Sequence, residues 1–489
     1  MTAEAIMLLA IALPLAAMLP IALTGAMPNL REAVTLATAV GLFLVVLQLL
    51  PVAMAGGQPE IALFDILPGV PFAFRLEPLG MIFAFVASLL WIVNSIYSIG
   101  YMRGNDESHQ TRFYVCFAFA IGSTMGIALA GNMLTLFIFY EMLTLSTYPL
   151  VTHKGSDAAK RAGRTYLGIL ISTSICFLLL GIIWTWTLTG TLDFTAGGIL
   201  AGKADGPLVG LLFLLYMYGI GKAALMPMHR WLPAAMVAPT PVSALLHAVA
   251  VVKAGVFTVV KVVVYVFGVE YLTALPASQW VMWIACFTIL AASLIALRQD
   301  NLKRRLAYST ISQLSYVVLA ALILSPLSVM GAALHIAAHA FGKITLFFAA
   351  GSIYTAAHKT EISQLDGIGW RMPVTMGAFA IGSLSMIGLP PTAGFISKWF
   401  MLQGAWQTEN LLALAVIAGS TLLNAAYFLP IVYAAFFRKE KHDGDHHEHG
   451  EAPLPIVLAL GATAGLSVLM FLFPGDAIAL AEALVGRSG

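Results

Sequence analysis

The chain has 489 residues, of which 60% are hydrophobic and only 10% are charged. A soluble protein of this length has nearer about 25% charged residues, so a water-soluble globular domain is excluded. The net charge of +2 does not indicate nucleic-acid binding, because the basic residues cluster in short loops between apolar segments.

Runs of about 20 apolar residues recur from one end of the chain to the other, and each is long enough to cross a bilayer. They predict an all-α polytopic membrane protein with about fourteen transmembrane helices. The first run lacks a basic n-region, so we expect no cleavable signal. In chain order, the predicted helices span 4–25, 31–54, 78–100, 113–131, 133–152, 164–189, 208–236, 241–267, 280–298, 304–325, 328–355, 374–404, 410–436 and 454–473.

The basic residues between these helices follow the odd-numbered helices almost without exception. Only Arg75 and Lys203 lie in loops after even-numbered helices. Cytoplasmic loops carry the excess of lysine and arginine, so the odd-numbered loops are predicted to be cytoplasmic and both termini to lie outside.

The fifth predicted helix contains Glu141, which we interpret as the only acidic residue inside a long apolar segment. A charge at bilayer depth costs about 2.5–3.5 kcal/mol on insertion scales, so buried charges predict the movement of protons or cations. Basic residues and histidines in the other apolar segments are Lys222, His229, Arg230, His247, Lys253, Lys261, His335, His339, Lys343 and Lys398.

Two predicted helices, the seventh and the twelfth, contain helix-breaking residues beside a lysine. Gly219 and Gly221 precede Lys222, and the segment GLPP precedes Lys398. Freed backbone groups in a membrane need a protein-lined cavity. The breaks lie five helices apart, which predicts two inverted five-helix repeats made of helices 4–8 and 9–13. Packing kinks, with the lysines reaching toward the interface, are the alternative.

These repeats divide the chain into four predicted parts. They are an N-terminal three-helix segment (1–110), a first half-channel (111–268), a second half-channel (269–437), and a charged loop with a C-terminal helix (438–489).

In the eighth predicted helix, His247 and Lys253 are expected to face inward, and Lys261 is interpreted as an interfacial anchor. Glu141 is expected to hold a proton on Lys222, with Lys253 as the alternative partner. A static buried ion pair is a further alternative, although such pairs are not reliably stabilising.

The eleventh predicted helix has His335, His339 and Lys343 at intervals of four residues, so they share one helical face. Imidazole accepts a proton on one nitrogen and releases one from the other, which favours a proton relay. A metal site is disfavoured, because no adjacent glutamate or third ligand is evident. Histidines that are simply hydrogen-bonded within the bundle are the other alternative.

No cofactor is predicted for this chain. Cys116, Cys176 and Cys286 are isolated and are interpreted as small buried apolar side chains. No paired-cysteine spacing, dinucleotide-binding glycine motif or phosphate-binding loop occurs. The stretch RKEKHDGDHHEHGE (438–451) has four histidines; we favour a solvated loop over a divalent-metal site.

Four segments carry a resemblance to a known family: GNMLTLFIFYEMLTLSTYPLV, KAALMPMHRWLPAAMVAPTPVSALLHAVAVVKAGV, HIAAHAFGKITLFFAAGS and IGLPPTAGFISKW. They resemble the antiporter-like subunits shared by respiratory complex I, Mrp-type Na⁺/H⁺ antiporters and membrane-bound hydrogenases. The resemblance covers roughly residues 110–430 and implies fourteen helices in two inverted repeats. It also implies roles for Glu141 and its partner Lys222, the bridging Lys253, the central His335 and His339, and the terminal Lys398. Lys343 and His247 are predicted from their positions to be secondary members of the relay.

Within this family, chain size and Lys398 most resemble the Mrp D-type subunit, whereas Ala235 and Val237 stand where complex I members often have acidic residues. The resemblance implies a proton-translocating subunit of an Mrp-type Na⁺/H⁺ exchanger in a bacterial cytoplasmic membrane. A pumping subunit of a redox-driven complex is the alternative. Its expected partners are other membrane subunits, the lipid bilayer and protons; whether Na⁺ shares the path is open. A stand-alone solute carrier fits the row of histidines and lysines less well. A quinone oxidoreductase subunit would need a redox centre or a quinone pocket from a partner, and nothing in the sequence identifies one.

Overall fold

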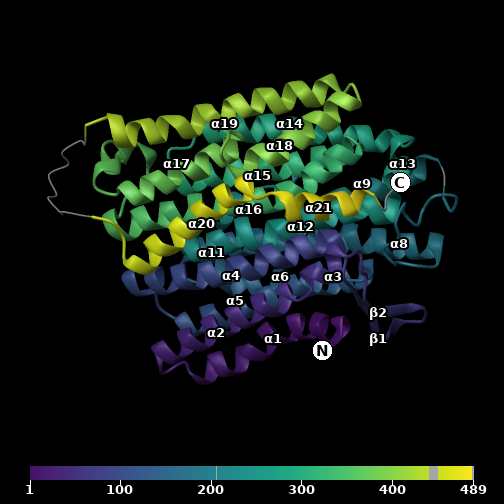
Figure 1. The fold of residues 1–489 in the computed structure, drawn as a ribbon, viewed down its shortest axis with the longest axis horizontal. Helices are drawn as coiled ribbons and strands as arrows, with labels where there is room; N and C mark the ends of the chain where they lie inside the picture. The colour runs from purple at the N-terminus through teal and green to yellow at the C-terminus, as the bar shows by residue number, and fades with distance from the viewer. Residues whose placement is uncertain (205, 440–449, 487–489) are drawn as a thin grey trace.

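Long helices lie side by side along most of the protein in the computed structural model (Figure 1), which describes residues 1–204, 206–439 and 450–486. Within these residues, eleven helices are long and apolar enough to cross a membrane. The predicted multi-pass helical fold is therefore confirmed, whereas the number of fourteen spans and the repeats stay predictions. Residues 440–449, which hold the four histidines of the charged loop, lie outside the described residues.

The helices before residue 275 include several short pieces where the sequence predicts single spans. They are α1 (Ala3–Leu23), α2 (Pro28–Leu47), α3 (Leu50–Met54), α4 (Pro78–Gly104), α5 (Gln110–Ala128), α6 (Met133–Val151), α7 (Asp157–Thr173), α8 (Leu180–Thr189), α9 (Pro207–Gly219), α10 (Trp231–Ala234), α11 (Thr240–Ala244), α12 (Val251–Lys261) and α13 (Val269–Thr273). Short π-helical turns at 174–179, 245–249 and 262–267 join some of these pieces.

The second part of the chain matches the predicted spans closely and adds one short helix, α21. Its helices are α14 (Pro276–Leu297), α15 (Leu302–Leu322), α16 (Pro326–Ala357), α17 (Pro373–Ile387), α18 (Ala393–Gln407), α19 (Leu411–Phe437), α20 (Leu454–Leu472) and α21 (Gly475–Val485).

Local sequence signals explain where many of these helices begin. The side chains of Asn132, Ser156 and Asn301 each accept a hydrogen bond from the backbone N–H three residues further on, which satisfies a donor left free at a helix start. Pro28 and Pro78 occupy the first position of α2 and α4, where the missing N–H of proline costs nothing.

An antiparallel hairpin of β1 (Glu60–Leu67) and β2 (Val70–Arg75) follows α3 and was not predicted from the sequence. Its signal is the alternation of apolar residues on both sides of Pro68-Gly69, where Gly69 has a φ of 78°. The Arg75 N–H donates to the carbonyl of Leu129 at 2.8 Å, so the hairpin is tied to the loop before α6. It lies at the end of the bundle that also holds α13 (Figure 1).

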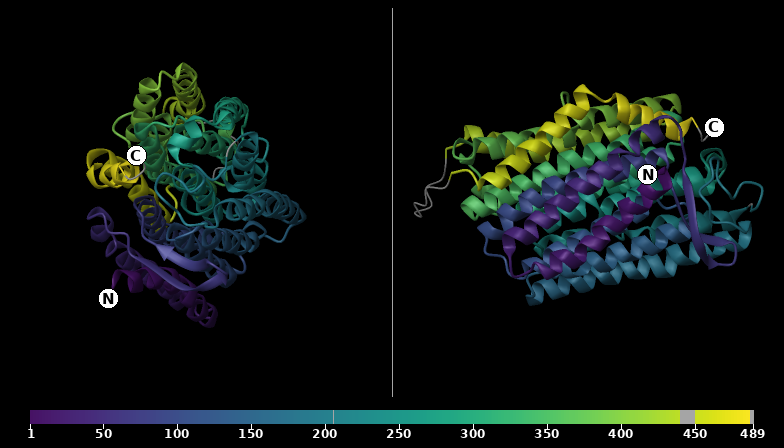
Figure 2. Two further views of the ribbon diagram at one scale, coloured as in Figure 1. Left: turned by 90° about the vertical axis from the view of Figure 1, so that its right-hand side faces the viewer. Right: turned by 60° about the horizontal axis from the view of Figure 1, so that its bottom comes forward.

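Residues 240–267 and α16 form the centre of the bundle, because the most apolar stretch of each is wholly buried. By contrast, the most apolar stretch of residues 28–54 is only 28% buried, and that of residues 157–189 only 33% buried. These helices therefore have faces open to lipid or to other subunits. The end-on view in Figure 2 places the N-terminal helices and the green helices of the second part on opposite sides.

Both predicted helix breaks are confirmed. The helix α9 ends at Gly219, and Lys222 lies in a single 3-10 turn before Ala224, whose φ is 55°. The helix α17 ends at Ile387, followed by Gly388 with a φ of 90°, and α18 begins five residues later. Glycine adopts a positive φ with little strain, as Gly388 does, whereas Ala224 has a positive φ although it carries a Cβ atom.

The interpretation of the three cysteines as buried is wrong for Cys176, which is exposed, whereas Cys286 is buried and Cys116 is intermediate. An apolar segment of a membrane protein can face lipid as readily as the protein core, so an apolar sequence context does not predict burial.

Candidate functional site

Lys222 is fully buried at the break after α9, where it contacts α6. Its ammonium donates to the carbonyl of Tyr140 at 2.7 Å and to the hydroxyl of Thr144 at 2.6 Å. The same ammonium lies 3.1 Å from the centre of the Tyr140 ring. These contacts favour the charged form of Lys222 without a carboxylate in direct contact.

Glu141 does not form the predicted contact pair with Lys222, nor the alternative pair with Lys253. Both carboxylate oxygens of Glu141 are buried, and among the described residues neither has a hydrogen-bond partner or a cation within 4.0 Å. Tyr140 and Thr144 lie four residues apart on the α6 face toward Lys222, whereas Glu141 is turned by about 100° from Tyr140. Its effect on Lys222 is therefore limited to the electric field of its charge.

Lys253 joins α12 to α16 through a hydrogen bond between its ammonium and Nδ1 of His339. Lys253 and His339 are both buried, as the sequence predicts for inward-facing residues. Nε2 of His339 has no partner among the described residues, and the His335 ring lies 5.9 Å away, centre to centre. The structure thus brings three predicted residues together at the middle of the bundle.

His335 is held through both ring nitrogens. Its Nε2–H donates to Oε1 of Gln313 at 3.0 Å, which leaves Nδ1 to accept from the hydroxyl of Ser397 at 2.8 Å. The amide of Gln313 in turn donates to the carbonyl of Met386 at 3.3 Å. Gln313 and Ser397 were missed in the sequence, although Ser309, Thr310 and Gln313 share one face of α15.

Lys398 is buried at the second break, where α17 ends. Its ammonium donates to the carbonyls of Met386 and Ile387, both at 2.9 Å. The last carbonyls of a helix have no partner within the helix and attract cations, so the break itself creates the lysine site. Because the Met386 carbonyl also accepts from Gln313, one backbone oxygen links Lys398 to His335 through Gln313.

Lys343 reaches the same carbonyl by a second route. Its ammonium donates to Ser309 Oγ at 2.8 Å, and the Ser309 hydroxyl lies 3.0 Å from the hydroxyl oxygen of Tyr427, to which it can donate. The Tyr427 hydroxyl donates to Oδ1 of Asn424, whose amide donates to the Met386 carbonyl at 3.3 Å. The polar residues of α19 on this branch were not singled out in the sequence.

His247 lies in the π-helical turn before α12 and is fully buried. Its Nδ1 is 3.1 Å from the hydroxyl of Thr310, and its ring is 4.7 Å from that of Phe347. Its Nε2 has no partner among the described residues. The inward orientation predicted for His247 is confirmed.

The remaining basic residues divide into two kinds. Arg230 is exposed and His229 half-buried, at the start of α10. Lys261, by contrast, is fully buried in an ion pair with Glu77, so its interpretation as an interfacial anchor is wrong. Glu77 stands just before α4 and only the fold places it beside Lys261, 184 residues away.

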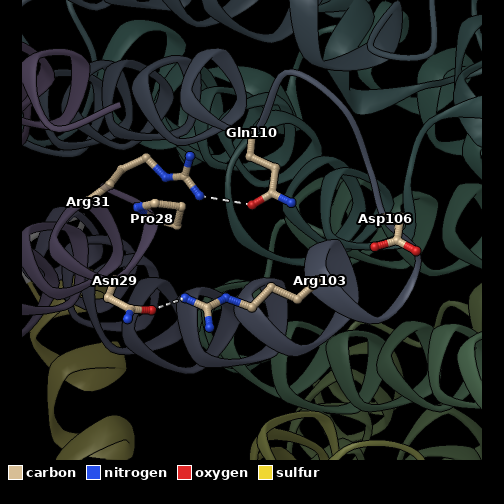
Figure 3. A pocket seen from close by; sticks show the side chains of 6 residues that line it. All are labelled: Pro28, Asn29, Arg31, Arg103, Asp106 and Gln110. Carbon is tan, nitrogen blue, oxygen red and sulfur yellow. Dashed lines mark hydrogen bonds between the residues drawn. The ribbon is translucent and has the colours of Figure 1, made fainter. Parts of the chain in front are cut away.

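A separate cluster of charged residues lies where α2 begins and α4 ends (Figure 3). Arg31 donates to Gln110 at 2.9 Å, and Arg103 donates to Asn29 at 2.6 Å and pairs with Glu32. Nearby, burial and the charge of Arg112 lower the pKa of His153 to about 4, so His153 is neutral at neutral pH. These contacts connect α2 with α4 and α5, away from the buried lysines.

The resemblance implies proton translocation, and on this basis replacing Tyr427 with phenylalanine is expected to slow transport by about three- to tenfold, because the hydroxyl between Ser309 and Asn424 is lost while one route to Lys398 remains. The loss of one buried hydrogen bond should lower stability by about 1 kcal/mol. The rate in reconstituted vesicles tests this, with the exposed Tyr433→Phe as the matched control. A rate equal to that of the control would show that this branch carries no protons.

This chain is similar to known proteins in sequence and in fold. The family described as NADH:quinone oxidoreductase/Mrp antiporter, transmembrane, matches residues 130–424, which include every buried lysine and histidine described above. The chain is 33% identical over 383 residues to NADH-quinone oxidoreductase subunit N of Desulforudis audaxviator, which covers 78% of this chain and 75% of that protein.

The chain is also 31% identical over 420 residues to the A/B component of a probable K⁺/H⁺ antiporter of Rhizobium meliloti, which covers 83% of this chain but only 41% of that longer protein. Among solved structures, a chain of the Mrp complex from Dietzia sp. superimposes with a TM-score of 0.87 at 20% identity, over 99% of this chain and 97% of that one. A chain of respiratory complex I from Thermus thermophilus superimposes with a TM-score of 0.83 at 23% identity, over 99% of this chain and 100% of that one. Both solved structures are of multisubunit membrane complexes.

Proposed function

Because this chain belongs to the NADH:quinone oxidoreductase/Mrp antiporter family of membrane subunits, we propose that it is the proton-translocating subunit of a multisubunit cation/proton antiporter of the Mrp type. Its partners would be other membrane subunits, and the transported ions would be protons and Na⁺. The proton path would run along the buried lysines and histidines in the middle of the bundle.

One observation carries the proposal: a set of buried polar contacts runs from Lys253 through His339 and His335 to Lys398. Its members are a lysine–histidine hydrogen bond, two imidazoles 5.9 Å apart, and the link from His335 through Gln313 to the carbonyl that holds Lys398. Imidazole and amine groups both exchange protons, and such groups are costly inside a membrane unless they are used.

Lys222 would receive protons on the cytoplasmic side and pass them to Lys253. The turn that holds Lys222 packs against Gly255 of α12, two residues beyond Lys253. Ordered water would complete this step, because no hydrogen bond joins the two ammonium groups among the described residues. Glu141 would act through its field, making the protonated form of Lys222 more stable when its carboxylate is ionised.

The placement in the membrane is part of the same proposal. We place both termini outside a bacterial cytoplasmic membrane, since the basic loops follow the odd-numbered predicted helices. The half-channels at 111–268 and 269–437 would each contain one broken helix with its lysine, flanked by the segments 1–110 and 438–489. In support, the start of α1 and the end of α21 lie in the same half of the bundle as the hairpin (Figures 1 and 2).

A second candidate function is a proton-pumping subunit of a redox-driven, complex I-like assembly. The 33% identity to NADH-quinone oxidoreductase subunit N over three quarters of that protein favours it. The same relay would serve both functions, because only the source of energy differs.

Everted vesicles that contain the complete complex test the two functions. A Na⁺ pulse is expected to collapse a preformed pH gradient in these vesicles but not in vesicles that lack the complex. A gradient that responds to electron donors and not to Na⁺ would replace the antiporter by the redox-driven pump. A gradient that responds to neither would contradict both functions.

A further inference from the structure

The buried ion pair of Glu77 and Lys261 lies outside the proposed relay. The ammonium of Lys261 donates to Oε2 of Glu77, and the side chains are 0% and 2% exposed. Lys261 is the last residue of α12, and Glu77 follows β2 by two residues, so the pair lies toward the hairpin end of the bundle.

Aromatic rings enclose this pair. The Lys261 ammonium lies 4.0 Å from the centre of the Phe194 ring, 5.3 Å from that of Tyr265 and 5.6 Å from that of Phe257. In such an apolar site the ions lose most of their hydration, and a buried ion pair is often no more stable than apolar side chains of the same volume. A contribution to the stability of the fold is therefore a weak explanation for the presence of this ion pair.

The position of the pair connects it to the proposed relay. Lys253 and Lys261 are on the same helix, eight residues apart, which corresponds to about 12 Å along the helix axis. Phe194, whose ring contacts the Lys261 ammonium, is joined to Arg75: the guanidinium donates to the Phe194 carbonyl at 2.6 Å and to Glu60 at 2.7 Å. The side chain of Arg75 is 20% exposed and that of Glu60 is 43% exposed, so this group connects the surroundings of the pair with the surface.

We infer that Glu77 and Lys261 form a proton-exchanging pair through which the relay opens toward the hairpin end, in addition to the route toward Lys398. This inference rests on the proposed function. A proton moves from the Lys261 ammonium to the Glu77 carboxylate, which leaves a neutral amine and a neutral carboxylic acid. The acid then releases the proton toward the surface, and the amine takes up a new proton from the side of Lys253. The steps reverse when the flux reverses.

The low polarity of the site makes this exchange accessible. Transfer within the pair removes two buried charges at once, so the cost of desolvating the ions offsets the loss of their attraction. The Arg103–Glu32 pair in the other charged cluster cannot do this, because a guanidinium keeps its proton at all physiological pH values. It therefore serves as an internal control.

Lys261→Arg tests the inference in the complete complex reconstituted into vesicles. The variant keeps the buried charge and the ion pair but cannot release a proton. We expect assembled complex with cation/proton exchange reduced at least about tenfold, as for the loss of a general acid–base group. An assembled variant that keeps most of the wild-type rate would overturn the inference and leave only a structural clamp.

Carbodiimide labelling of the wild-type complex gives a second, independent measurement, which decides the case if Lys261→Arg does not assemble. The reagent modifies carboxyl groups that become protonated in apolar sites. Glu77 is expected to be labelled, whereas Glu32, which is paired with an arginine, is not. Failure of Glu77 to be labelled would overturn the inference.

The results that would contradict the proposed function differ from those that would contradict the proton exchange between Glu77 and Lys261. If the wild-type complex transports and Lys253→Met does not, while Lys261→Arg transports normally, the relay stands and the pair has no part in it. If the wild-type complex neither exchanges cations for protons nor pumps protons, the proposed function itself is wrong.

Discussion

Replacing Lys253 with methionine is expected to lower transport by about 10²- to 10⁴-fold, the range measured for the loss of a positioned acid–base group. Among the described residues, the hydrogen bond from Lys253 to His339 is the link between α12 and the α16 histidines. Methionine has a similar length and no charge, so it fills the space of the lysine but cannot hold a proton. The proton path would be cut at the centre of the bundle.

The complex should still assemble in this variant. An apolar side chain in a fully buried site avoids the desolvation cost of an ammonium group, so the stability should be close to that of the wild type. The exposed Lys160→Met is the matched control, since it removes the same functional group from the surface. Transport at the control rate in Lys253→Met would remove Lys253 from the path and, with it, the observation that carries the proposed function.

Replacing Gly255 with alanine should damage both assembly and transport. A Cβ atom at Gly255 would lie 2.4 Å from the backbone nitrogen of Ala223 and 2.4 Å from the carbonyl carbon of Lys222. These are backbone atoms of the break, which cannot turn aside as a flexible side chain can. Overpacking of this kind costs about 1–3 kcal/mol, and the displaced turn would move Lys222 from Tyr140 and Thr144.

Thermal unfolding of the purified complex, together with its transport rate, checks this expectation. Gly377→Ala in α17 is the matched control, because nothing lies within 4 Å of its added Cβ. Replacing glycine by alanine inside a helix is then expected to stabilise by about 0.5–1 kcal/mol. If Gly255→Ala behaves like this control, the close approach of α12 to the break is not required for the site.

The sequence predicted the residues with unusual chemistry better than it predicted their partners. Lys222, Lys253, His335, His339 and Lys398 stand out because charge and imidazole are rare in apolar segments. Apart from the hydrogen bond between Lys253 and His339, their polar partners are serine, threonine, glutamine and backbone carbonyls, which are common in helices and have no distinguishing pattern. Gln313 is one example, since it acquires its role only where α15 meets α16 and α17.

Glu141 and Lys261 also show that the sequence does not predict contacts: Glu141 lacks the ion pair that was expected, and Lys261 has one that was not. Glu141 is the acid that the sequence singles out, yet its position on α6 turns it away from the contacts of Lys222. Lys261 is interpreted as an anchor from the sequence, because it lies near the outer end of its predicted helix. The hairpin and the start of α4 bring Glu77 to it from far along the chain.

The sequence by itself determined that this chain crosses a membrane many times, where two helices break and which apolar segments hold titratable side chains. These properties depend on hydropathy, backbone preference and side-chain chemistry, which act locally. Only the tertiary structure decided which groups touch: His339 with Lys253, Glu77 with Lys261, and two polar branches on the Met386 carbonyl. Such contacts depend on the rotation and depth of each helix relative to its neighbours, which long-range packing sets.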